Sequence, residues 1–404
     1  MKKILVLSAH SFSLDRRIIA QLNALDAKKY SVTLVSVPIQ GDFKAEVSPS
    51  IRIIHQAFNQ IPSKKQKIFT CICSLLATPV ANFIKFIYRR YIEFYKTTKY
   101  LIKNTPCEEF DYIHAHDLST LKAAYILRHR LKVKKVLYDS HELWGEQFPL
   151  RIEANSWNKL EVKLCKRVDA IIAVNDSIKT ILSKRITNSN IITILNSYGI
   201  SPFQKQSGFD AINPLFLSAK KTKNLVLFQG SLGKERNLEN LTLAFEYLKD
   251  QATLLFLGEG PLKQNLQEIV TKNNLSNVIF HDWVLQSELI SILKKADLGI
   301  IPYLGDKILN NHYCTPNKLF EYIHARVPIC ASNLPELVKF VDGYKIGKTH
   351  SMLTPLSIAE AIKNMLELKA NDYFPLENFL QAEIEIGWPA QEKKLLNLYT
   401  ELEK

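Results

Sequence analysis

Short runs of β-branched and other apolar residues alternate with segments of helical periodicity along most of this chain of 404 residues. In the first half the runs are KILVLSA, YSVTLVSV, IRIIHQ, DYIHAHD, KKVLYDSH, DAIIAVN and IITILNS. In the second half they are NLVLFQGS, TLLFLGEG, NVIFHDW, LGIIPY and VPICAS, separated by helical segments such as 238–248 and 286–294. This alternation predicts parallel sheets with crossover helices, so the expected fold class is α/β.

A non-periodic stretch, residues 201–223, divides the two series of runs and reads as a linker. The prediction is therefore two doubly wound, Rossmann-like domains, at residues 1–205 and 215–375, followed by a segment 376–404 that ends in an amphipathic helix at 389–402. Ligands of open parallel sheets bind beyond the carboxyl ends of the strands. We therefore expect a site in a cleft between two facing domains.

Composition excludes several classes of protein. Hydrophobic residues make up 47% of the chain and charged residues 23%, which argues against a disordered chain and against an integral membrane bundle. The six cysteines form no CxxC pair, so we expect reduced thiols and neither a disulfide framework nor a zinc site. The apolar run near the N-terminus, ILVL, is too short for a signal peptide. These observations predict a cytoplasmic protein.

The positive charge is confined to the first half of the chain. Residues 1–200 contain 31 Lys and Arg against 16 Asp and Glu, whereas the remainder has 22 against 23. Within residues 60–104, nine basic residues and one acid are interleaved with eight Phe and Tyr. Such a segment can lie on an anionic membrane, and we expect neutralisation of Arg89, Arg90 and Lys96 to abolish that binding. The alternatives are a solvated basic face over a core helix and, without a recognisable module for it, nucleic-acid binding.

The chain lacks the usual nucleotide and metal motifs. No glycine occurs in the first strand-to-helix turn, SAHSFSLDRR, and the turn from Gly258 to Gly260 lacks the third glycine of GxGxxG. There is no P-loop motif, and no DxD by which paired carboxylates commonly hold a divalent ion on a diphosphate. Any phosphate must then be neutralised by side chains and helix ends, so we expect neither a metal nor a resident cofactor.

Two segments of the second half are candidates for such an anion site. The first is the turn 230–237, which follows a strand and carries Arg236. The second is CTPNKLFEY, where Lys318 and Glu321 are three residues apart on one face of a helix. The lysine can meet a phosphate while the carboxylate accepts hydrogen bonds from sugar hydroxyls. An ordinary surface salt bridge between the two residues is the alternative.

These strings also carry a resemblance to a known family. PNKLFEYIHARVPICASNLPEL, preceded by ADLGIIPY and FQGSLGKERNLENL, resembles the donor half of GT-B glycosyltransferases of the large retaining family 4. DYIHAHDLSTL, VLYDSHELWGE and DAIIAVNDSI look like the acceptor half of the same family, and WPAQEKKLLNLYTEL looks like its C-terminal helix returning to the N-terminal domain. The resemblance covers nearly the full length, with residues 40–108 matching least.

The resemblance implies a nucleotide-diphosphate sugar as donor and a glycan or lipid-linked acceptor. It assigns Arg236 and Lys318 to the donor diphosphate, Glu321 to the ribose, and His116 to the cleft near the transferred sugar. The implied catalytic set is His116, Arg236 and Lys318. The implied donor-binding set is Gly230, Ser231, Gly258, Glu259, Asp282, Trp283, Asn317, Lys318, Leu319 and Glu321. The implied acceptor-side set is Asp15, Arg16, Asp117, His141 and Glu142.

The chain departs from the family pattern at several positions. Tyr313 stands where the E-x7-E motif has its first Glu, Ser231 replaces a frequent Arg, and Asp282 replaces a frequent Gly. The first turn lacks the family's Gly-Gly loop, although Asp15 and Arg16 resemble a variant of it.

The mechanism implied by the resemblance is metal-independent transfer with retention, in which fixed cations stabilise the departing diphosphate. By analogy the protein would build a bacterial surface polysaccharide, lipopolysaccharide or capsule at the inner face of the cytoplasmic membrane. A GT-B-shaped epimerase or phosphorylase and a non-catalytic nucleotide-sugar binder stay open as alternatives.

Overall fold

The computed structural model describes residues 1–9, 15–37, 46–55, 78–148, 150–187, 190–197, 222–284, 286–305 and 308–404. The chain forms two compact units. The N-terminal unit contains residues 1–195, 200–203 and 392–404, and the C-terminal unit contains residues 196–199 and 204–391. Most of the linker predicted at 201–223 lies outside the described residues, as do residues 60–77 of the basic segment and residues 10–14 of the first turn.

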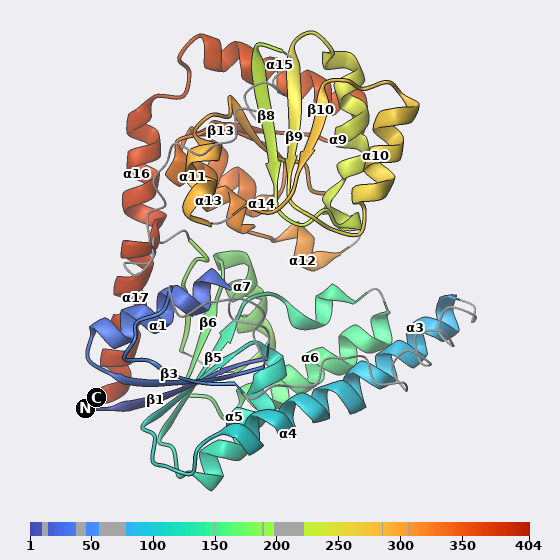
Figure 1. Cartoon of the computed structure of the whole chain (residues 1–404). Helices are drawn as coiled ribbons and strands as arrows, with labels where there is room; N and C mark the ends of the chain where they lie inside the picture. Colours follow the sequence, from blue (N-terminus) through green and yellow to red (C-terminus); the bar gives the residue numbers. More distant parts are fainter. Residues whose placement is uncertain are drawn as a thin grey trace. The chain divides into compact units, whose positions relative to one another are not determined.

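The N-terminal unit is built on a seven-stranded parallel sheet with the order β3-β2-β1-β4-β5-β6-β7. Its strands are β1 (Lys3–Ser8), β2 (Ser31–Ser36), β3 (Arg52–Ile54), β4 (Tyr112–His116), β5 (Lys135–Ser140), β6 (Ala170–Ala173) and β7 (Ile191–Thr193). In Figure 1 helices flank this sheet on both sides. The strand order reverses between β1 and β4, and in such sheets the ligand site lies beyond the carboxyl ends of the strands at that point.

The C-terminal unit repeats the same topology with a six-stranded parallel sheet, β10-β9-β8-β11-β12-β13. Its strands are β8 (Asn224–Gln229), β9 (Ala252–Leu257), β10 (Val278–His281), β11 (Leu298–Ile301), β12 (Ile329–Ser332) and β13 (Gly347–His350). The order reverses between β8 and β11. The sequence runs predicted every strand of this sheet except β13, whose residues GKTH contain a single β-branched side chain.

The helices of the N-terminal unit are α1 (Arg16–Ala27), α3 (Thr78–Ile87), η2 (Tyr88–Glu93), α4 (Phe94–Asn104), α5 (Leu118–Arg130), η3 (Trp144–Gln147), α6 (Arg151–Cys165) and α7 (Asp176–Arg185). Those of the C-terminal unit are η4 (Lys234–Arg236), α9 (Leu238–Ala244), η5 (Phe245–Leu248), α10 (Lys263–Lys272), α11 (Gln286–Leu293), α12 (Leu309–His312), α13 (Asn317–Ala325), α14 (Pro335–Leu337), η6 (Val338–Asp342), α15 (Pro355–Ala370) and α16 (Leu376–Ile386). The last helix, α17 (Trp388–Glu403), begins in the C-terminal unit and ends in the N-terminal unit.

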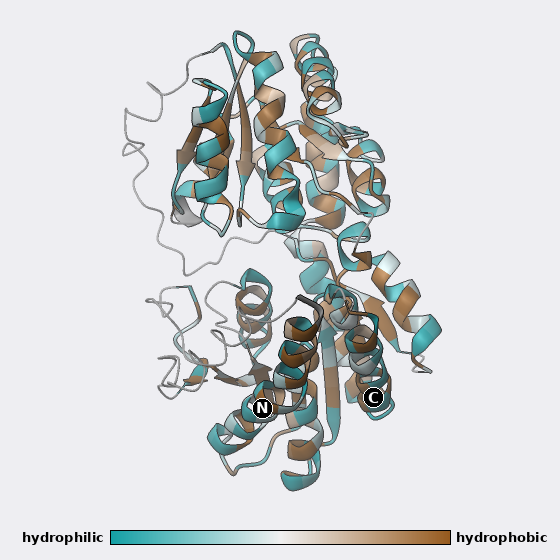
Figure 2. Ribbon diagram, turned by 90° about the vertical axis from the view of Figure 1, so that its right-hand side faces the viewer, coloured by the Kyte–Doolittle hydropathy of each residue, from teal (hydrophilic) through white to brown (hydrophobic). Residues whose placement is uncertain are grey.

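The strands are continuous apolar runs because both faces of each sheet are covered. In β1 and β8 every residue after the first is buried, a pattern that parallel sheets between helical layers require. Figure 2 shows this directly, since the strands are mainly brown while the helices carry hydrophilic faces.

Helix starts are marked by capping side chains, for example Asp15 at α1 and Asn175 at α7, which accept hydrogen bonds from backbone N–H groups of the first turn.

The final helix returns to the N-terminal unit, as the family resemblance predicted. Leu395, Leu398 and Tyr399 of α17 are buried in that unit's core. The Tyr399 hydroxyl lies 3.0 Å from Nδ1 of His114, and Glu403 forms an ion pair of 3.2 Å with Lys2 near the start of β1. The two termini accordingly lie close together in Figure 1. In the described part of the chain, no helix has both the length and the apolar character needed to cross a membrane.

Candidate functional site

In the C-terminal unit, two glycines hold the turns at the reversal point of the sheet. Gly230 follows β8 with φ 116°, and Gly258 follows β9 with φ 145°. A Cβ added to Gly258 would lie 2.3 Å from the Gly230 carbonyl oxygen, so the two turns approach too closely for any side chain there. Nearby, the Leu232 N–H donates to the Glu259 carbonyl over 2.9 Å. The glycines thus keep the backbone after β8 clear of side chains.

A buried lysine borders the turn that Gly230 opens. Lys318, in the first turn of α13, is only 5% exposed. Its Nζ would lie 3.5 Å from a Cβ added to Gly230, which is an ordinary van der Waals distance. Nζ also lies 3.5 Å from the centroid of the Phe228 ring and 5.0 Å from that of Tyr303. It has no hydrogen-bond partner among the described residues. A buried ammonium group without an acceptor is costly, which marks this as a place for an anion.

Arg236 places a second cation beside Lys318. Its guanidinium stacks on the Tyr303 ring, with 4.3 Å from Cζ to the ring centroid. Burial lowers the pKa of Lys318 well below its usual range, and the charge of Arg236 lowers it further. Burial also raises the pKa of the neighbouring Cys314 thiol to about 11, so this cysteine adds no negative charge. Arg236 at the end of η4 and Lys318 at the start of α13 thus place two basic side chains against the same ring, an arrangement suited to a diphosphate.

Glu321 takes part in a different contact from the one that its spacing predicts. Its carboxylate accepts a hydrogen bond from Nε2 of Gln229, the last residue of β8, and both side chains are buried. The alternative of an exposed salt bridge between Lys318 and Glu321 is therefore wrong, because neither side chain is at the surface. Gln229 and the ring of Tyr303 are the parts of this cluster that the sequence did not single out.

The other predicted donor-binding residues are spread over different environments. Ser231, Asn317, Asp282 and Trp283 are exposed, and Trp283 is 58% exposed. Glu259 and Asp282 each lie 2.5 Å from Nζ of Lys263, which joins the turns after β9 and β10. Leu319 lies next to Lys318 in α13; its side chain is completely buried, and its N–H donates to the Pro316 carbonyl over 2.9 Å.

The reversal point of the N-terminal sheet holds a buried ion pair that the sequence did not reveal. Arg17, in the first turn of α1, donates from Nε and Nη2 to both oxygens of Asp139 on β5, over 2.9 and 2.8 Å, and from Nη1 to the Ile194 carbonyl. Gln21 donates to the same carboxylate over 2.8 Å. Burial would raise the pKa of Asp139, but the charge of Arg17 holds it well below its usual range. The predicted Arg16 precedes this residue and is half-buried.

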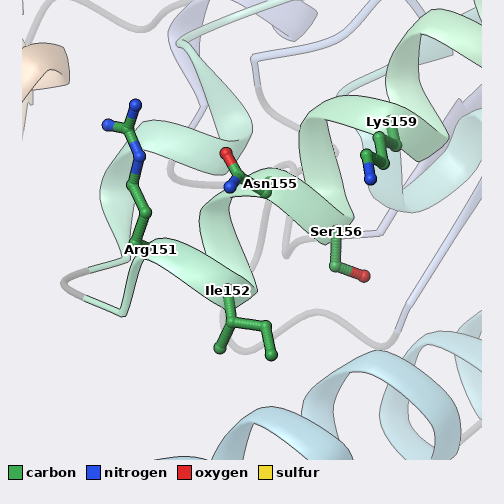
Figure 3. A pocket seen from close by; sticks show the side chains of 5 residues that line it. All are labelled: Arg151, Ile152, Asn155, Ser156 and Lys159. Atoms are coloured by element: carbon green, nitrogen blue, oxygen red, sulfur yellow. The ribbon is translucent and has the colours of Figure 1, made fainter.

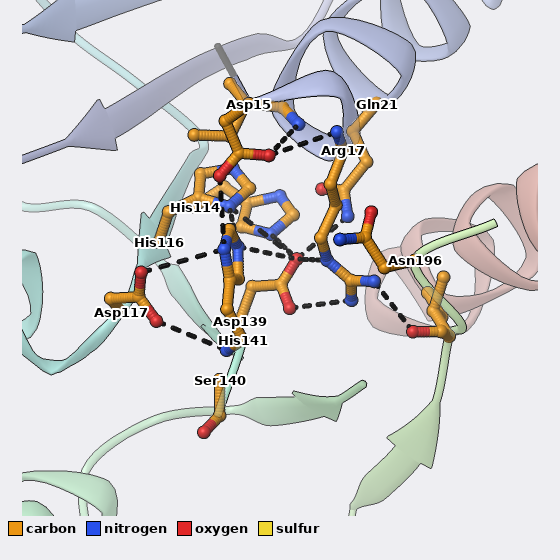
Figure 4. Close-up of polar contacts among 12 residues, drawn as sticks. Asp15, Arg17, Gln21, His114, His116, Asp117, Asp139, Ser140, His141 and Asn196 are labelled. Atoms are coloured by element: carbon orange, nitrogen blue, oxygen red, sulfur yellow. Dashed lines mark hydrogen bonds and ion pairs between the residues drawn. The ribbon is translucent and has the colours of Figure 1, made fainter. Parts of the chain in front are cut away.

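Three histidines lie against this ion pair (Figure 4). His114 and His116, both on β4, are stacked with ring centroids 4.6 Å apart. Nδ1 of His116 lies 3.0 Å from Nε2 of His141, whose Nδ1 lies 3.3 Å from Asp15 and 3.6 Å from Asp117. The structure thus brings together four of the predicted residues, Asp15, His116, Asp117 and His141. Glu142 follows His141 and is half-buried.

Among the described residues, His114, His116 and Asp139 form the group whose spacing approaches that of a metal site. One ligand atom from each of His114, His116 and Asp139 lies within 4.8 Å of the others. Both oxygens of Asp139 already accept from Arg17, so a divalent ion there would displace or face a guanidinium. These residues do not fit a metal ion.

The described part of the basic segment, residues 78–104, has two different faces. Arg89 donates to Glu153 of α6 in three contacts of 2.6–3.0 Å, and Arg90 donates to Ser156 over 3.2 Å and stacks on Trp157. Both guanidinium groups therefore make contacts within the unit, so replacing Arg89 or Arg90 would also remove packing and hydrogen bonds, whereas Lys96 is exposed. The opposite face is exposed and apolar or aromatic, with Val80, Phe83, Ile87, Tyr91, Ile92 and Tyr95.

A surface pocket of about 540 Å³ lies on α6 beside this segment (Figure 3). It is lined by Arg151, Ile152, Asn155, Ser156 and Lys159. Ser156 is also the acceptor for Arg90 of η2. The pocket is open and basic, and it is separate from the histidine cluster.

Two family descriptions match the sequence, one in each unit. "Glycosyltransferase Family 4" matches residues 14–198, and "Glycosyl transferases group 1" matches residues 223–368. Among curated relatives, the uncharacterized glycosyltransferase YqgM of Bacillus subtilis is 26% identical over 201 residues, 48% of this chain and 53% of the relative. The putative teichuronic acid biosynthesis glycosyltransferase TuaH of the same species is 24% identical over 226 residues, 52% and 53% of the two chains. The chain thus spans about half the length of the curated relatives it matches.

Solved structures resemble the chain over its whole length. Sucrose-phosphate synthase from Thermosynechococcus elongatus has a TM-score of 0.72 and 17% identity, covering 100% of this chain and 99% of that one. HepE from Anabaena, in complex with UDP and glucose, has a TM-score of 0.71 and 13% identity, covering 99% and 100%. Such likenesses show the fold, which is GT-B. With a family match in each unit and this fold, the chain belongs to the GT4-like glycosyltransferases.

Proposed function

We propose that this protein transfers a sugar from a nucleotide-diphosphate sugar to a glycan or lipid-linked acceptor, with retention and without a metal. The observation that carries the proposal is the buried, unpartnered ammonium group of Lys318 beside Arg236, at the reversal point of the C-terminal sheet. Both cations lie next to a turn that Gly230 keeps free of side chains. Together they can offset two of the negative charges of a leaving nucleoside diphosphate, the role that a divalent ion would otherwise have.

The names of similar proteins support this choice of substrate class. HepE was solved with UDP and with UDP-glucose. TuaH and the putative colanic acid biosynthesis glycosyl transferase WcaI of Escherichia coli, 25% identical over 123 residues, are named for bacterial polysaccharides. We propose the same setting here, the building of a surface polysaccharide or a lipid-linked glycan.

Thermal unfolding with UDP-, GDP-, ADP- and CMP-linked sugars tests the proposal. One class of donor is expected to raise the unfolding temperature and then to be consumed only when an acceptor fraction is added. Stabilisation without turnover on any acceptor would favour a binder, the possibility raised by Tyr313 in the E-x7-E motif. Consumption without an acceptor would favour an epimerase. No stabilisation by any nucleotide sugar would contradict the proposal.

We further propose that the exposed face of α3, η2 and α4 lies on an anionic membrane, where a lipid-linked acceptor is found. The apolar and aromatic side chains of this face are flanked by the exposed Lys85, Lys96, Lys99 and Lys103, against one exposed acid, Glu93. Aromatic side chains enter the interface, and each lysine near an anionic surface contributes on the order of 1 kcal/mol. The basic pocket on α6 lies next to this face, because Ser156, which lines the pocket, accepts a hydrogen bond from Arg90 of η2.

Sedimentation with vesicles tests the membrane proposal. Binding to vesicles containing phosphatidylglycerol is expected at low salt and is expected to weaken as salt screens the lysines. Lys96→Gln with Lys99→Gln should lower the partition coefficient by about 30-fold, since two charges are lost. Phe83→Ser with Tyr91→Ser should also lower it, whereas Tyr247→Ser, which replaces an exposed tyrosine of the C-terminal unit, should have no effect. Equal binding by the wild type and by both of these double variants would remove the membrane claim.

A further inference from the structure

The two rings of His116 and His141 share a single hydrogen bond, and its direction determines what His116 offers a ligand. Nδ1 of His116 and Nε2 of His141 are 3.0 Å apart, so one of the two nitrogens carries the proton between them. The other nitrogen of His116, Nε2, is buried and has no hydrogen-bond partner among the described residues. If His141 donates, Nε2 of His116 carries a proton; if His116 donates, Nε2 is a bare lone pair.

The surroundings of His141 decide between these cases. Its Nδ1 lies 3.3 Å from Oδ2 of Asp15 and 3.6 Å from Oδ2 of Asp117, and its Nε2 lies 3.9 Å from Oδ2 of Asp139. Arg17 is bound to Asp139, the carboxylate that faces Nε2 of His141. Carboxylates at Nδ1 can only accept, so Nδ1 is protonated, and two negative charges on one ring favour a second proton on Nε2.

The protonation equilibria agree with this geometry. Burial alone would lower the pKa of His141, but the charges of Asp117 and Asp15 raise it to about 10. Burial alone would raise the pKa of Asp15, but His141 lowers it to about 2. Burial and the neighbouring His114 hold the pKa of His116 well below its usual value, so its ring carries one proton. An imidazolium at position 141 then donates to a neutral ring at position 116.

The backbone of Asp117 supplies an independent observation. Its φ of 64° and ψ of 161° lie in a region that glycine adopts almost exclusively, at a cost of about 1–3 kcal/mol for other residues. This conformation is held by the Asp117 N–H, which donates to the Asp139 carbonyl over 2.9 Å. It directs the carboxylate to His141, whose backbone N–H donates to Oδ1 over 3.2 Å. Such strain persists where the surrounding structure requires it, and here it aims a carboxylate at His141.

We propose that Asp15, Asp117 and His141 form a positioning relay that keeps the proton of His116 on Nε2, so that His116 meets a bound ligand as a hydrogen-bond donor and not as a base. This inference rests on the proposed function for the identity of the ligand, whose acceptor would be an oxygen of the sugar or of its phosphate. A buried N–H without an acceptor costs about 1–3 kcal/mol, a cost that a ligand oxygen at Nε2 removes. His116 lies at the carboxyl end of β4, where ligands of such sheets bind.

Nitrogen-15 NMR of the histidine-labelled wild-type protein tests the relay without any substrate. Long-range proton correlations distinguish the two neutral tautomers from the imidazolium. At pH 7.5, both nitrogens of His141 are expected to be protonated and His116 is expected to carry its proton on Nε2 alone. The double variant Asp15→Asn, Asp117→Asn removes both charges, while Asn at position 15 still caps α1. It should lower the pKa of His141 by about 3 pH units or more, to below 7.5, and so shift the proton of His116 to Nδ1. Glu109→Gln removes a charge elsewhere in the unit and should change neither ring.

Kinetics separate the relay from the proposed function. If a nucleotide sugar is turned over, the double variant should lose at least about tenfold in kcat/KM, and His116→Gln, which keeps an N–H donor, should retain more activity than His116→Ala. A base at position 116 would instead tolerate the double variant, since the variant frees the Nε2 lone pair. An unprotonated Nε2 in the wild type, or unchanged tautomers in the double variant, would overturn the relay. Absence of turnover with the expected NMR pattern would refute only the proposed function.

Discussion

Replacement of Lys318 by Met is expected to lower kcat/KM by about 10²–10³ while the free protein becomes more stable. The loss of activity follows because a charge that faces the leaving diphosphate acts mainly in the transition state. The gain in stability follows because Nζ is buried without an acceptor, and Met fills similar space without the ammonium group. The pKa of Lys318 is lowered by burial and by Arg236, so the cost to folding is present at neutral pH and disappears above about 10.5, where the unfolded lysine also loses its proton.

The same lysine predicts a pH dependence of binding. A diphosphate stabilises the charged form, so binding takes up a proton wherever the free protein holds Lys318 neutral, and affinity falls as the pH rises. Calorimetry in two buffers of different ionisation enthalpy measures this uptake, which Lys318→Met should abolish. Lys272→Ala, at the exposed end of α10, is the matched control and should leave activity, stability and proton uptake unchanged. Wild-type turnover by Lys318→Met would remove Lys318 from the donor site and contradict the mechanism.

Replacement of Arg17 by Met is expected to destabilise the N-terminal unit by about 3–5 kcal/mol. The variant leaves the carboxylate of Asp139 completely buried without its cation. The loss should be greatest at neutral pH and smaller in acid, because loss of the Arg17 charge raises the pKa of Asp139 and protonation then removes the buried charge. Urea denaturation at pH 5 and pH 7.5 measures both effects.

A double-mutant cycle identifies the cause of this loss. Arg17→Met with Asp139→Asn should recover much of the stability, since no buried charge is left without a partner. Arg130→Met, at the exposed end of α5, is the control for losing an arginine and should change stability by no more than about 0.5 kcal/mol. A loss of similar size in the double variant would show that the packing of the arginine, and not its charge, holds the unit together.

The sequence was sufficient for the fold because hydrophobic patterning is a local property. Twelve apolar runs predicted the strands of both sheets apart from β13, which is short and has little β-branched character. The motif around Lys318 and Glu321 was recognisable from the sequence, but the burial of Lys318 was not, since it depends on Phe228 of β8 and on Tyr303 after β11. Arg17 and Asp139 are 122 residues apart, so neither position alone indicates an ion pair. For Arg89 and Arg90, the run of basic residues gave no sign of their partners, because Glu153 and Trp157 lie on α6, more than 60 residues away.

The path of α17 has a consequence for synthesis of the protein. The core of the N-terminal unit contains Leu395 and Tyr399, and its β4 histidine pairs with the Tyr399 hydroxyl. On the ribosome, this unit therefore remains unfinished while the strands of the other unit emerge and fold, although domains usually fold in the order in which they are made. A nascent chain arrested before residue 395 should be cleaved readily by protease within its first 195 residues, and the full chain should resist.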